Sequence, residues 1–299
     1  MTDFYRVRKN LFGEKGRRGD QLWEWTMKGL RATEIPVTAS LPEVDNTELK
    51  LLNVLWTVLI DDIADEYEIS RASLILPSVI LGEVSNNIYS KNEKDYIELI
   101  FEIGNILGVE VKKLPSYSNY KNWYIEEFER LKLSFTYSFL IRTDPENIDI
   151  NKYIYVLSSN MQIVVNGIYD LMSFNDRPSE QELADIRKIL GFGQRMARII
   201  NSINSFEKEV VHKDFSSEII LWTCKLGLEE PKNLGKIDSG QLIQTIKSTR
   251  MKDFLIQMHS TYYSAIKQYA NHFSFLNFAE YLKTLDKFEK LQNEYKNEI

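Results

Sequence analysis

Apolar residues recur at helical spacing over most of the chain. Residues 46–67 carry Leu52, Leu55, Trp56 and Leu59, a spacing typical of one buried face of an α-helix. Similar patterns predict helices over residues 70–90, 93–107, 120–141, 150–172, 189–211, 241–272 and 275–296. The capping-box spacing of Ser179-Glu-Gln-Glu182 predicts a further short helix. No segment alternates as a strand does, so we expect an all-α fold of about ten packed helices.

Loops interrupt this pattern in two main places. Residues 175–178 read as a turn, and residues 227–240 collect one proline and three glycines. Neither stretch is long enough to be a linker, and the chain shows no internal repeat. We therefore expect one domain over residues 1–299, with residues 1–20 as an N-terminal segment able to fold over the mouth of a cavity as a lid.

Composition narrows the class of protein. The formal net charge is −6 with no block of Lys and Arg, whereas a nucleic-acid binder normally shows a basic stripe. Cys224 is the single cysteine, which excludes a disulfide within the chain and fits a reducing cytoplasm. The N-terminus has no secretory signal, and the apolar runs fall short of the roughly 20 residues that span a bilayer. We expect a cytoplasmic protein without membrane insertion.

The first candidate for chemistry is an acidic cluster that ends an apolar helix. Asp61 and Asp65 are four residues apart, so their carboxylates lie on one face, one turn apart. Like charges this close repel each other unless a cation lies between them, and Mg²⁺ prefers oxygen ligands that it shares with phosphates. The alternative is a solvated acidic helix end, although acids there oppose the helix dipole.

The second candidate is a polar stripe on a later helix. Asn201, Ser205 and Glu209 fall at i, i+4 and i+8, which places an amide oxygen, a hydroxyl and a carboxylate on one line. These hard oxygens suit another magnesium ion, and Lys208 lies within the same two turns. A polar face in water is the alternative, but the turns before it are apolar, as at Ile199 and Ile200.

Taken together, the two motifs resemble those of class I terpene synthases of the bacterial type. Asp61-Asp62-x-x-Asp65 looks like the aspartate-rich motif of that family. Asn201-x-x-x-Ser205-x-x-x-Glu209, 140 residues further on, looks like its second metal motif. The Lys208-Glu209 ending is also similar to bacterial members. The resemblance covers these two helices, the chain length and the helical character.

The resemblance implies an isoprenoid-synthase-type bundle around an apolar cavity, an isoprenoid diphosphate substrate and three Mg²⁺ ions. Asp61, with Asp65, would bind two ions, and Asn201, Ser205 and Glu209 the third. Asp62 would accept hydrogen bonds behind the ligands, and Lys208 would contact the diphosphate. The ionised substrate would then cyclise or rearrange to a hydrocarbon or alcohol. Members of that family are commonly dimers, so the resemblance also allows a homodimer. The cavity would need aromatic rings, for which the candidates are Trp56, Tyr153, Tyr155, Tyr169 and Phe206.

The chain departs from the family at three points. Ser202 stands where the second motif usually has Asp, and residues 153–162 lack the arginine that senses the diphosphate. The C-terminus has Tyr295 without the usual preceding arginine. Arg195 and Arg198, or the arginines within residues 6–18, are candidate replacements that bind the diphosphate. In lacking the sensor arginine, the chain resembles synthases that take a copalyl-type diphosphate. This resemblance favours a C20 substrate, linear or copalyl-type, over C15.

Competing interpretations lack their own motifs. A chain-elongating synthase would need a second aspartate-rich motif, and Asp61–Asp65 is the one DDxxD in the chain. Squalene or phytoene synthases need two Asp-x-x-x-Asp pairs, and the chain has one, Asp61 with Asp65. A protonation-initiated cyclase needs Asp-x-Asp-Asp, which the sequence lacks. The alternatives left open are a catalytically inactive or chain-elongating isoprenoid-fold protein, and a helical scaffold or binding protein.

Overall fold

Helices make up the fold throughout the described part of the chain. A computed structural model describes residues 20–38, 42–66, 69–82 and 91–294. Within them the one β-type pairing is an isolated antiparallel bridge between Val37 and Leu276. The α-helices are α2 (Asp20–Ala32), α3 (Thr47–Glu66), α4 (Ile69–Leu81), α5 (Lys91–Glu110), α6 (Tyr117–Thr143), α7 (Ile150–Leu157), α8 (Ile163–Met172), α9 (Glu180–Val211), α10 (Glu218–Lys225), α11 (Ser239–Ser248), α12 (Met251–Lys267) and α13 (Phe278–Glu294). Short 3-10 helices are η1 (Val111–Lys113), η2 (Pro145–Asn147), η3 (Ser158–Met161) and η4 (Pro231–Asn233). The all-α prediction is confirmed for these residues.

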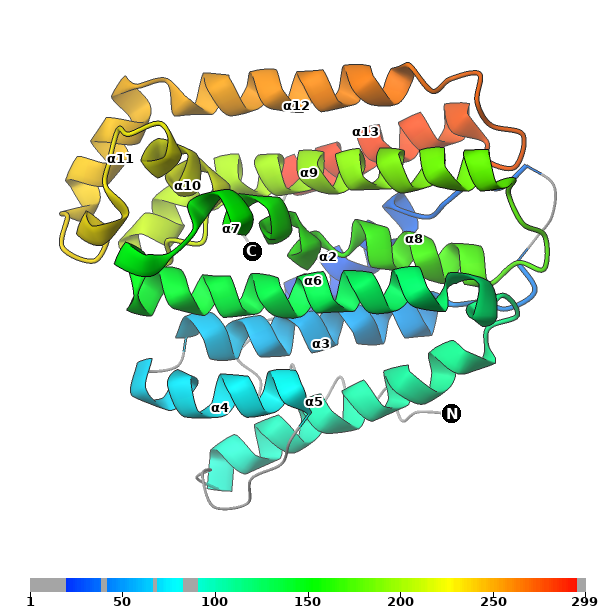
Figure 1. Ribbon diagram of the computed structural model, residues 1–299, viewed down its shortest axis with the longest axis horizontal. Coiled ribbons are helices and arrows are strands. Elements are labelled where there is room, and N and C mark those ends of the chain that lie inside the picture. Colours follow the sequence, from blue (N-terminus) through cyan, green and yellow to red (C-terminus); the bar gives the residue numbers. More distant parts are fainter. Residues whose placement is uncertain (1–19, 39–41, 67–68, 83–90, 295–299) are drawn as a thin grey trace.

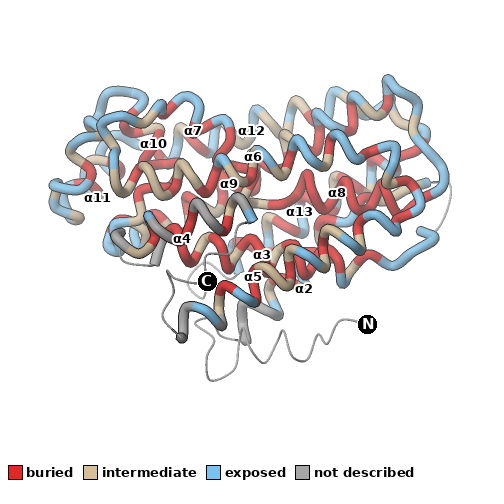
Figure 2. Tube along the Cα trace, turned by 60° about the horizontal axis from the view of Figure 1, so that its bottom comes forward, coloured by how far each residue is buried: buried red, intermediate tan, exposed pale blue. Residues whose placement is uncertain are grey.

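The other helices pack around α3 and α9. α3 contacts α2, α4, α5, α6 and α8, whereas α9 contacts α8, α10, α11, α12 and α13. In Figure 1, α12 runs along α9 at the top of the molecule, and α4 and α5 lie below α3. α8 packs against α6, α9 and α3, and all 10 of its residues are buried (Figure 2). α3 and α9 are thus placed to present their motifs to one interior.

The buried apolar side chains form two clusters that α9 joins. Ile189 and Leu190, in its first half, belong to a cluster with α3, α5, α6, α8 and α13. Ile199 and Ile203, further along, belong to a second cluster with α7, α10, α11 and α12. Since burial of apolar surface is the main stabilising contribution, a single continuous α9 couples the two halves of the core.

The segment 150–172, predicted as one helix, is divided in the structure. α7 ends at Leu157, η3 follows, and Gln162 takes a left-handed conformation with φ 60 before α8 begins. The segment 241–272 is likewise divided, at Arg250 with φ 55, into α11 and α12. Both predictions were wrong because neither break carries the glycine or proline that would reveal it in the sequence.

The predicted short helix at Ser179 is instead the beginning of α9. The Ser179 hydroxyl accepts a hydrogen bond from the Glu182 amide at 3.2 Å, as an N-cap does. The Glu182 carboxylate, however, accepts from the amides of Ser274 at 2.8 Å and Phe275 at 2.5 Å. It thereby fixes the α12–α13 connection on α9, which runs unbroken to Val211. α2 and α10 were not predicted at all.

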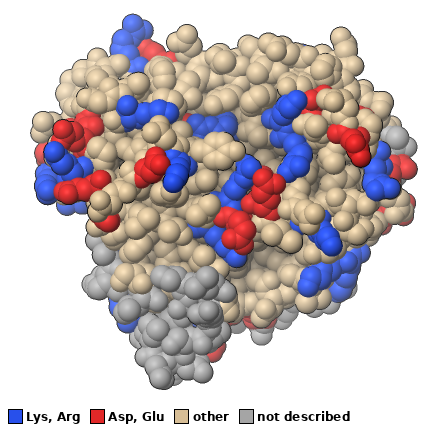
Figure 3. All heavy atoms as spheres, viewed as in Figure 1, with Lys and Arg blue, Asp and Glu red and all other residues tan. Residues whose placement is uncertain are grey.

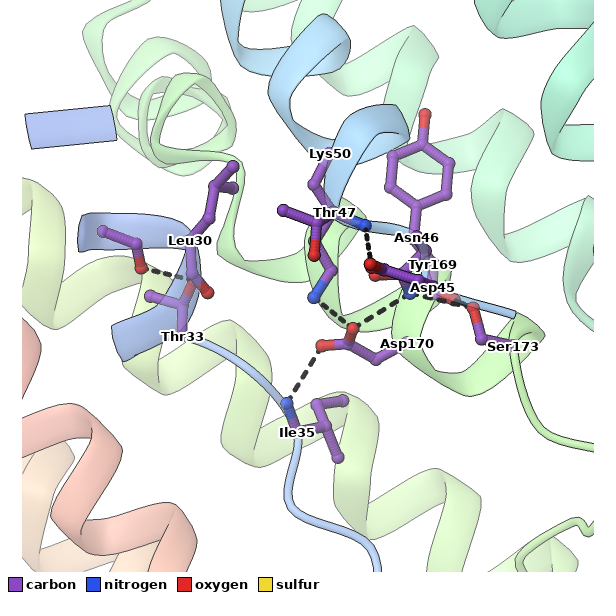
Figure 4. A network of polar contacts seen from close by, with 11 residues as sticks. Leu30, Thr33, Ile35, Asp45, Asn46, Thr47, Lys50, Tyr169, Asp170 and Ser173 are labelled. Carbon is purple, nitrogen blue, oxygen red and sulfur yellow. Dashed lines mark hydrogen bonds and ion pairs between the residues drawn. The ribbon is translucent and has the colours of Figure 1, made fainter. Parts of the chain in front are cut away.

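A buried ion pair fixes the start of α3 to the end of α8 (Figure 4). The Lys50 ammonium contacts the Asp170 carboxylate, and the two residues are 1% and 6% exposed. Asp170 also accepts hydrogen bonds from the Ile35 amide at 2.9 Å and from Asn46 Nδ2 at 3.1 Å. Asn46 Nδ2 in turn donates to Ser173 Oγ at 2.8 Å. Because both carboxylate oxygens of Asp170 have partners, the ion pair and its hydrogen bonds hold the segment after α2 in place.

Charges of both signs are mixed on the surface. On the face drawn in Figure 3, Lys and Arg side chains lie among Asp and Glu rather than in one continuous stripe. Several are ion-paired, as Arg130 is with Glu126 at 2.8 Å. Among the described helices, none is both long and apolar enough to cross a bilayer.

Candidate functional site

The acidic end of α3 divides its carboxylates between two environments. Asp61 is partly exposed and lines a cavity. Asp62 is 1% exposed and accepts a hydrogen bond from the Tyr96 hydroxyl of α5 at 2.8 Å. Asp62 is therefore buried against α5 and is not among the residues that line the cavity. Asp65 lies in the last turn of α3, and its side chain falls outside the described residues.

The polar stripe of α9 faces the same cavity. Asn201, Ser205 and Glu209 all line it, as helical spacing predicts. Ser205 Oγ lies 2.7 Å from the Asn201 carbonyl oxygen and 2.7 Å from Glu209 Oε1. Its single hydroxyl proton can be donated to one of these oxygens at a time. The Ser205 hydroxyl therefore has two acceptor oxygens beside it and one hydrogen to donate.

Among the three residues of the stripe, Glu209 is the one that carries a shifted pKa. Burial, followed by repulsion from Asp214, raises the pKa of Glu209 to about 7, against the attraction of Arg198. Glu209 Oε2 is buried without a well-aligned hydrogen bond, although the Ser217 hydroxyl lies near enough to the carboxylate to lower its pKa. A carboxylate so placed is stabilised by gaining a cation or a proton.

These oxygens are of the chemical kind that a magnesium ion binds. The donors of Asn201, Ser205 and Glu209 are an amide oxygen, a hydroxyl and a carboxylate, which are hard ligands of the kind Mg²⁺ takes. The Ser205 hydroxyl already contacts the Glu209 carboxylate and the Ser217 hydroxyl lies near it, so a metal ion would replace these contacts. The described residues contain no group of three or more His, Cys, Asp and Glu side chains suited to a metal. A site here would therefore rest on amide and hydroxyl oxygens beside one carboxylate.

The cavity brings the two motifs together. Its volume is about 1350 Å³, and both Asp61 and the α9 stripe line it although 140 residues separate Asp61 from Asn201. From Asp61 back along α3, Val58 and Val54 continue the wall. The other apolar lining residues are Trp25, Leu30, Met161, Ile203, Phe206, Ile246 and Phe288. The cavity thus joins an oxygen-rich motif region to an apolar wall.

The two candidate arginines of α9 differ in position. Arg198 lines the cavity, is 4% exposed and donates from one terminal nitrogen to the Ser216 carbonyl at 2.9 Å. Its Nε is buried without a hydrogen-bond partner among the described residues. Arg195 is not among the lining residues and is paired with the buried Glu218. The geometry favours Arg198 over Arg195 as a group for binding an anion.

Further basic side chains come from a region that the sequence analysis did not single out. Lys208 lines the cavity as an exposed residue. Lys247, Arg250 and Lys252, at the junction of α11 and α12, line it as well. Lys247 is 3.0 Å from Glu207, a neighbour of Lys208 on α9. Their sequence positions gave no signal because only the packing of α12 along α9 brings this junction to the cavity.

The aromatic candidates are divided between cavity and core. Phe206 lines the cavity, whereas Tyr153 and Tyr169 are fully buried in the core and Tyr155 is 68% exposed. Trp56 is also buried and absent from the lining. The additional rings on the wall are Trp25 of α2 and Phe288 of α13, with centroids 6.3 Å apart. Both were missed, Trp25 because α2 was not predicted.

The structure describes some of the positions where the sequence lacks the expected arginines. Asn160, Met161 and Gln162 of the 153–162 segment line the cavity, and none is basic. Near the end of α13 the lining residues are Phe288 and Gln292. Tyr295 and the arginines within residues 6–18 lie outside the described residues. The 153–162 segment therefore reaches the cavity with two amide side chains and no basic one.

Comparisons with known proteins add little. No family model and no solved structure matches the chain. A curated Mycoplasma pneumoniae protein named "Putative serine/threonine-protein kinase" is 30% identical over 78 residues, which cover 24% of this chain and 20% of that protein. Since the chain spans about a fifth of that protein's length, the match shows no family for this chain.

Proposed function

We propose that the chain is a magnesium-dependent class I terpene synthase that ionises an isoprenoid diphosphate. The observation that carries the proposal is the shared cavity: Asp61 and the stripe of Asn201, Ser205 and Glu209 line one space with an apolar wall. A scaffold with merely solvated acidic turns gives no reason for these distant motifs to converge on one cavity.

The residues divide the task of ionisation. Asp61 on α3 and the stripe on α9 would hold magnesium ions, which neutralise a bound diphosphate and make it a better leaving group. Arg198 and Lys208 would donate charge-assisted hydrogen bonds to the diphosphate oxygens as negative charge develops on them. Asp62 would orient this end of α3 through its contact with Tyr96.

The apolar wall would protect the cation. Val54 and Val58 exclude water from one side. The faces of Trp25, Phe206 and Phe288 can stabilise a passing positive charge through their quadrupoles. Because the 153–162 segment has no basic residue, we propose a C20 substrate first, linear or copalyl-type, with C15 as the second choice.

The test is turnover. Purified protein is incubated with magnesium and a panel of C15, C20 and copalyl-type diphosphates, and both released diphosphate and terpene products are measured. We expect release with one member of the panel, and its loss in the Asp61→Ala variant. A well-folded protein that releases diphosphate from no member would be a scaffold or an inactive relative.

A further inference from the structure

Gly29 lies inside a helix where the backbone does not require a glycine. It is a buried residue of α2, which continues to Ala32. Among the described glycines, positive φ angles occur at Gly82 and Gly227, not at Gly29. A glycine within a helix is less favourable than an alanine, because its backbone loses more conformational freedom on folding. The presence of Gly29 therefore needs another explanation.

Close packing does not require a glycine at this position either. A Cβ added to Gly29 would lie 3.5 Å from a ring carbon of Phe288 and 3.9 Å from a methyl carbon of Leu291, which are ordinary van der Waals distances. At Gly193, by contrast, a Cβ would lie 3.1 Å from Leu285 and would crowd α13. An alanine would thus fit at position 29, and the glycine leaves room for a methyl group between α2 and α13.

This room lies on the wall of the cavity. Trp25 and Gly29 are one turn apart on α2, and both line the cavity, as does Phe288 of α13. The ring centroids of Trp25 and Phe288 are 6.3 Å apart. The Thr33 hydroxyl, one turn further on, donates back to the Gly29 carbonyl at 3.0 Å. We call the part of the wall formed by Trp25, Gly29 and Phe288 the α2 recess, and its surface is mainly apolar.

The α2 recess lies apart from the metal motifs. On α13, Gln292 Nε2 donates to the Ala197 carbonyl of α9 at 3.1 Å, and Leu285 lies beside Gly193 of α9. Phe288 falls between Leu285 and Gln292, so it is level with the part of α9 that lies four to eight residues before the stripe begins. At 1.5 Å per residue, the recess is about 6–12 Å along α9 from the stripe. This separation places the recess beside the hydrocarbon of a bound substrate rather than beside its diphosphate.

We infer that Gly29 is a specificity-determining residue, and that the room it leaves in the α2 recess selects a C20 over a C15 hydrocarbon. This inference rests on the proposed function and deepens it by naming the substrate class. A C20 hydrocarbon has one more five-carbon unit to bury, and burial of that unit against an apolar wall favours binding. A side chain at position 29 would occupy the same space, so the larger hydrocarbon loses more than the smaller one.

The test measures binding and turnover of C15 and C20 ligands. The linear C15 and C20 isoprenoid alcohols, which carry no diphosphate, are titrated against the wild-type protein and its variants. We expect tighter binding of the C20 alcohol by the wild type. Gly29→Leu should lower the C20-to-C15 affinity ratio about tenfold, as a small misfit in an apolar pocket does, and Gly29→Ala should lower it by a smaller factor. The ratio of kcat/KM for the two diphosphates should fall in the same order.

Gly191→Ala is the matched control. Gly191 lies within α9, a Cβ added there would have open space around it, and it is not a lining residue. Both alanine variants should raise the melting temperature by about 1–3 °C, because each replaces a helical glycine. The C20-to-C15 ratio should fall in Gly29→Ala and stay at the wild-type value in Gly191→Ala. An unchanged ratio in both Gly29 variants would overturn the inference, and a lower melting temperature in Gly29→Ala would show that packing requires the glycine.

Binding and turnover together separate the two proposals. A protein that binds the alcohols with the expected ratio but releases no diphosphate would contradict the proposed function and leave the α2 recess as an apolar ligand site. A protein that releases diphosphate but keeps its ratio in Gly29→Leu would retain the proposed function and contradict the role of Gly29. Failure of the wild type to bind either alcohol would overturn the recess whether or not the protein turns over.

Discussion

Magnesium binding at the α9 stripe should weaken as the pH falls through about 7. A carboxyl group must lose its proton to bind a metal ion. Burial and the nearby Asp214, opposed by Arg198, raise the pKa of Glu209 to about 7. Such a group is about one-tenth protonated at pH 8 and about nine-tenths at pH 6, so apparent affinity should fall about tenfold over this range. A Glu with an ordinary pKa near 4.3 would produce almost no change there.

Calorimetry measures both the magnesium affinity and the protons released on binding. Magnesium titrations in two buffers of different ionisation enthalpy give the affinity and the number of protons released. We expect nearly one proton per ion at about pH 6 and about a tenth of one at about pH 8. Glu209→Gln should abolish this pH-linked binding. Glu207→Gln, at an exposed position two residues earlier, should retain it. Equal affinity at both pH values, or the same proton release from Glu209→Gln, would refute the role of Glu209.

Four further predictions concern single side chains. Asp61→Ala should lose most turnover with its helical circular dichroism unchanged, because Asp61 lines the cavity rather than the core; wild-type turnover would contradict this role. Arg198→Met should slow diphosphate release about ten- to a hundredfold through loss of a charge-assisted contact, whereas equal rates would exclude that contact. Arg195→Met should chiefly lower unfolding stability, by about 3–5 kcal/mol, because it leaves the buried Glu218 without its cation; chemical denaturation measures this loss, and an unchanged midpoint would refute it. Lys50→Met should lower the melting temperature through the same effect on its buried partner carboxylate; equal melting temperatures would show the pair to be dispensable.

The periodic parts of the fold could be predicted from the sequence. α3 was predicted over 46–67 and spans Thr47–Glu66, because its apolar positions repeat without interruption. The i, i+4, i+8 spacing also predicted that Asn201, Ser205 and Glu209 share a face, and they line one cavity. The helices predicted at 179–182 and over 189–211 are one helix, α9, and Gly193 lies within it. A Cβ there would lie 3.1 Å from Leu285, so this glycine permits close packing of α13 rather than ending α9.

The rest depended on tertiary packing. The left-handed turn at Gln162 is held by Asn53, which lies 109 residues away in the sequence, so no local pattern announces it. Trp25 and Arg250 reach the cavity from α2 and from the α11–α12 junction through contacts between distant helices. Sequence spacing locates residues along one helix face, whereas the opposite wall of a cavity is set by which helices meet.

Identifying which substrate bond breaks is the most direct test of the central claim, that this cavity carries out carbocation chemistry. Ionisation cleaves the carbon–oxygen bond of the substrate, so diphosphate leaves with all its original oxygens. Phosphorus NMR of a reaction run with magnesium in ¹⁸O-labelled water should therefore detect intact, unlabelled diphosphate. Free phosphate, or ¹⁸O bonded to phosphorus, would mean that water attacks phosphorus. Either result would contradict the assignment of this cavity to carbocation chemistry.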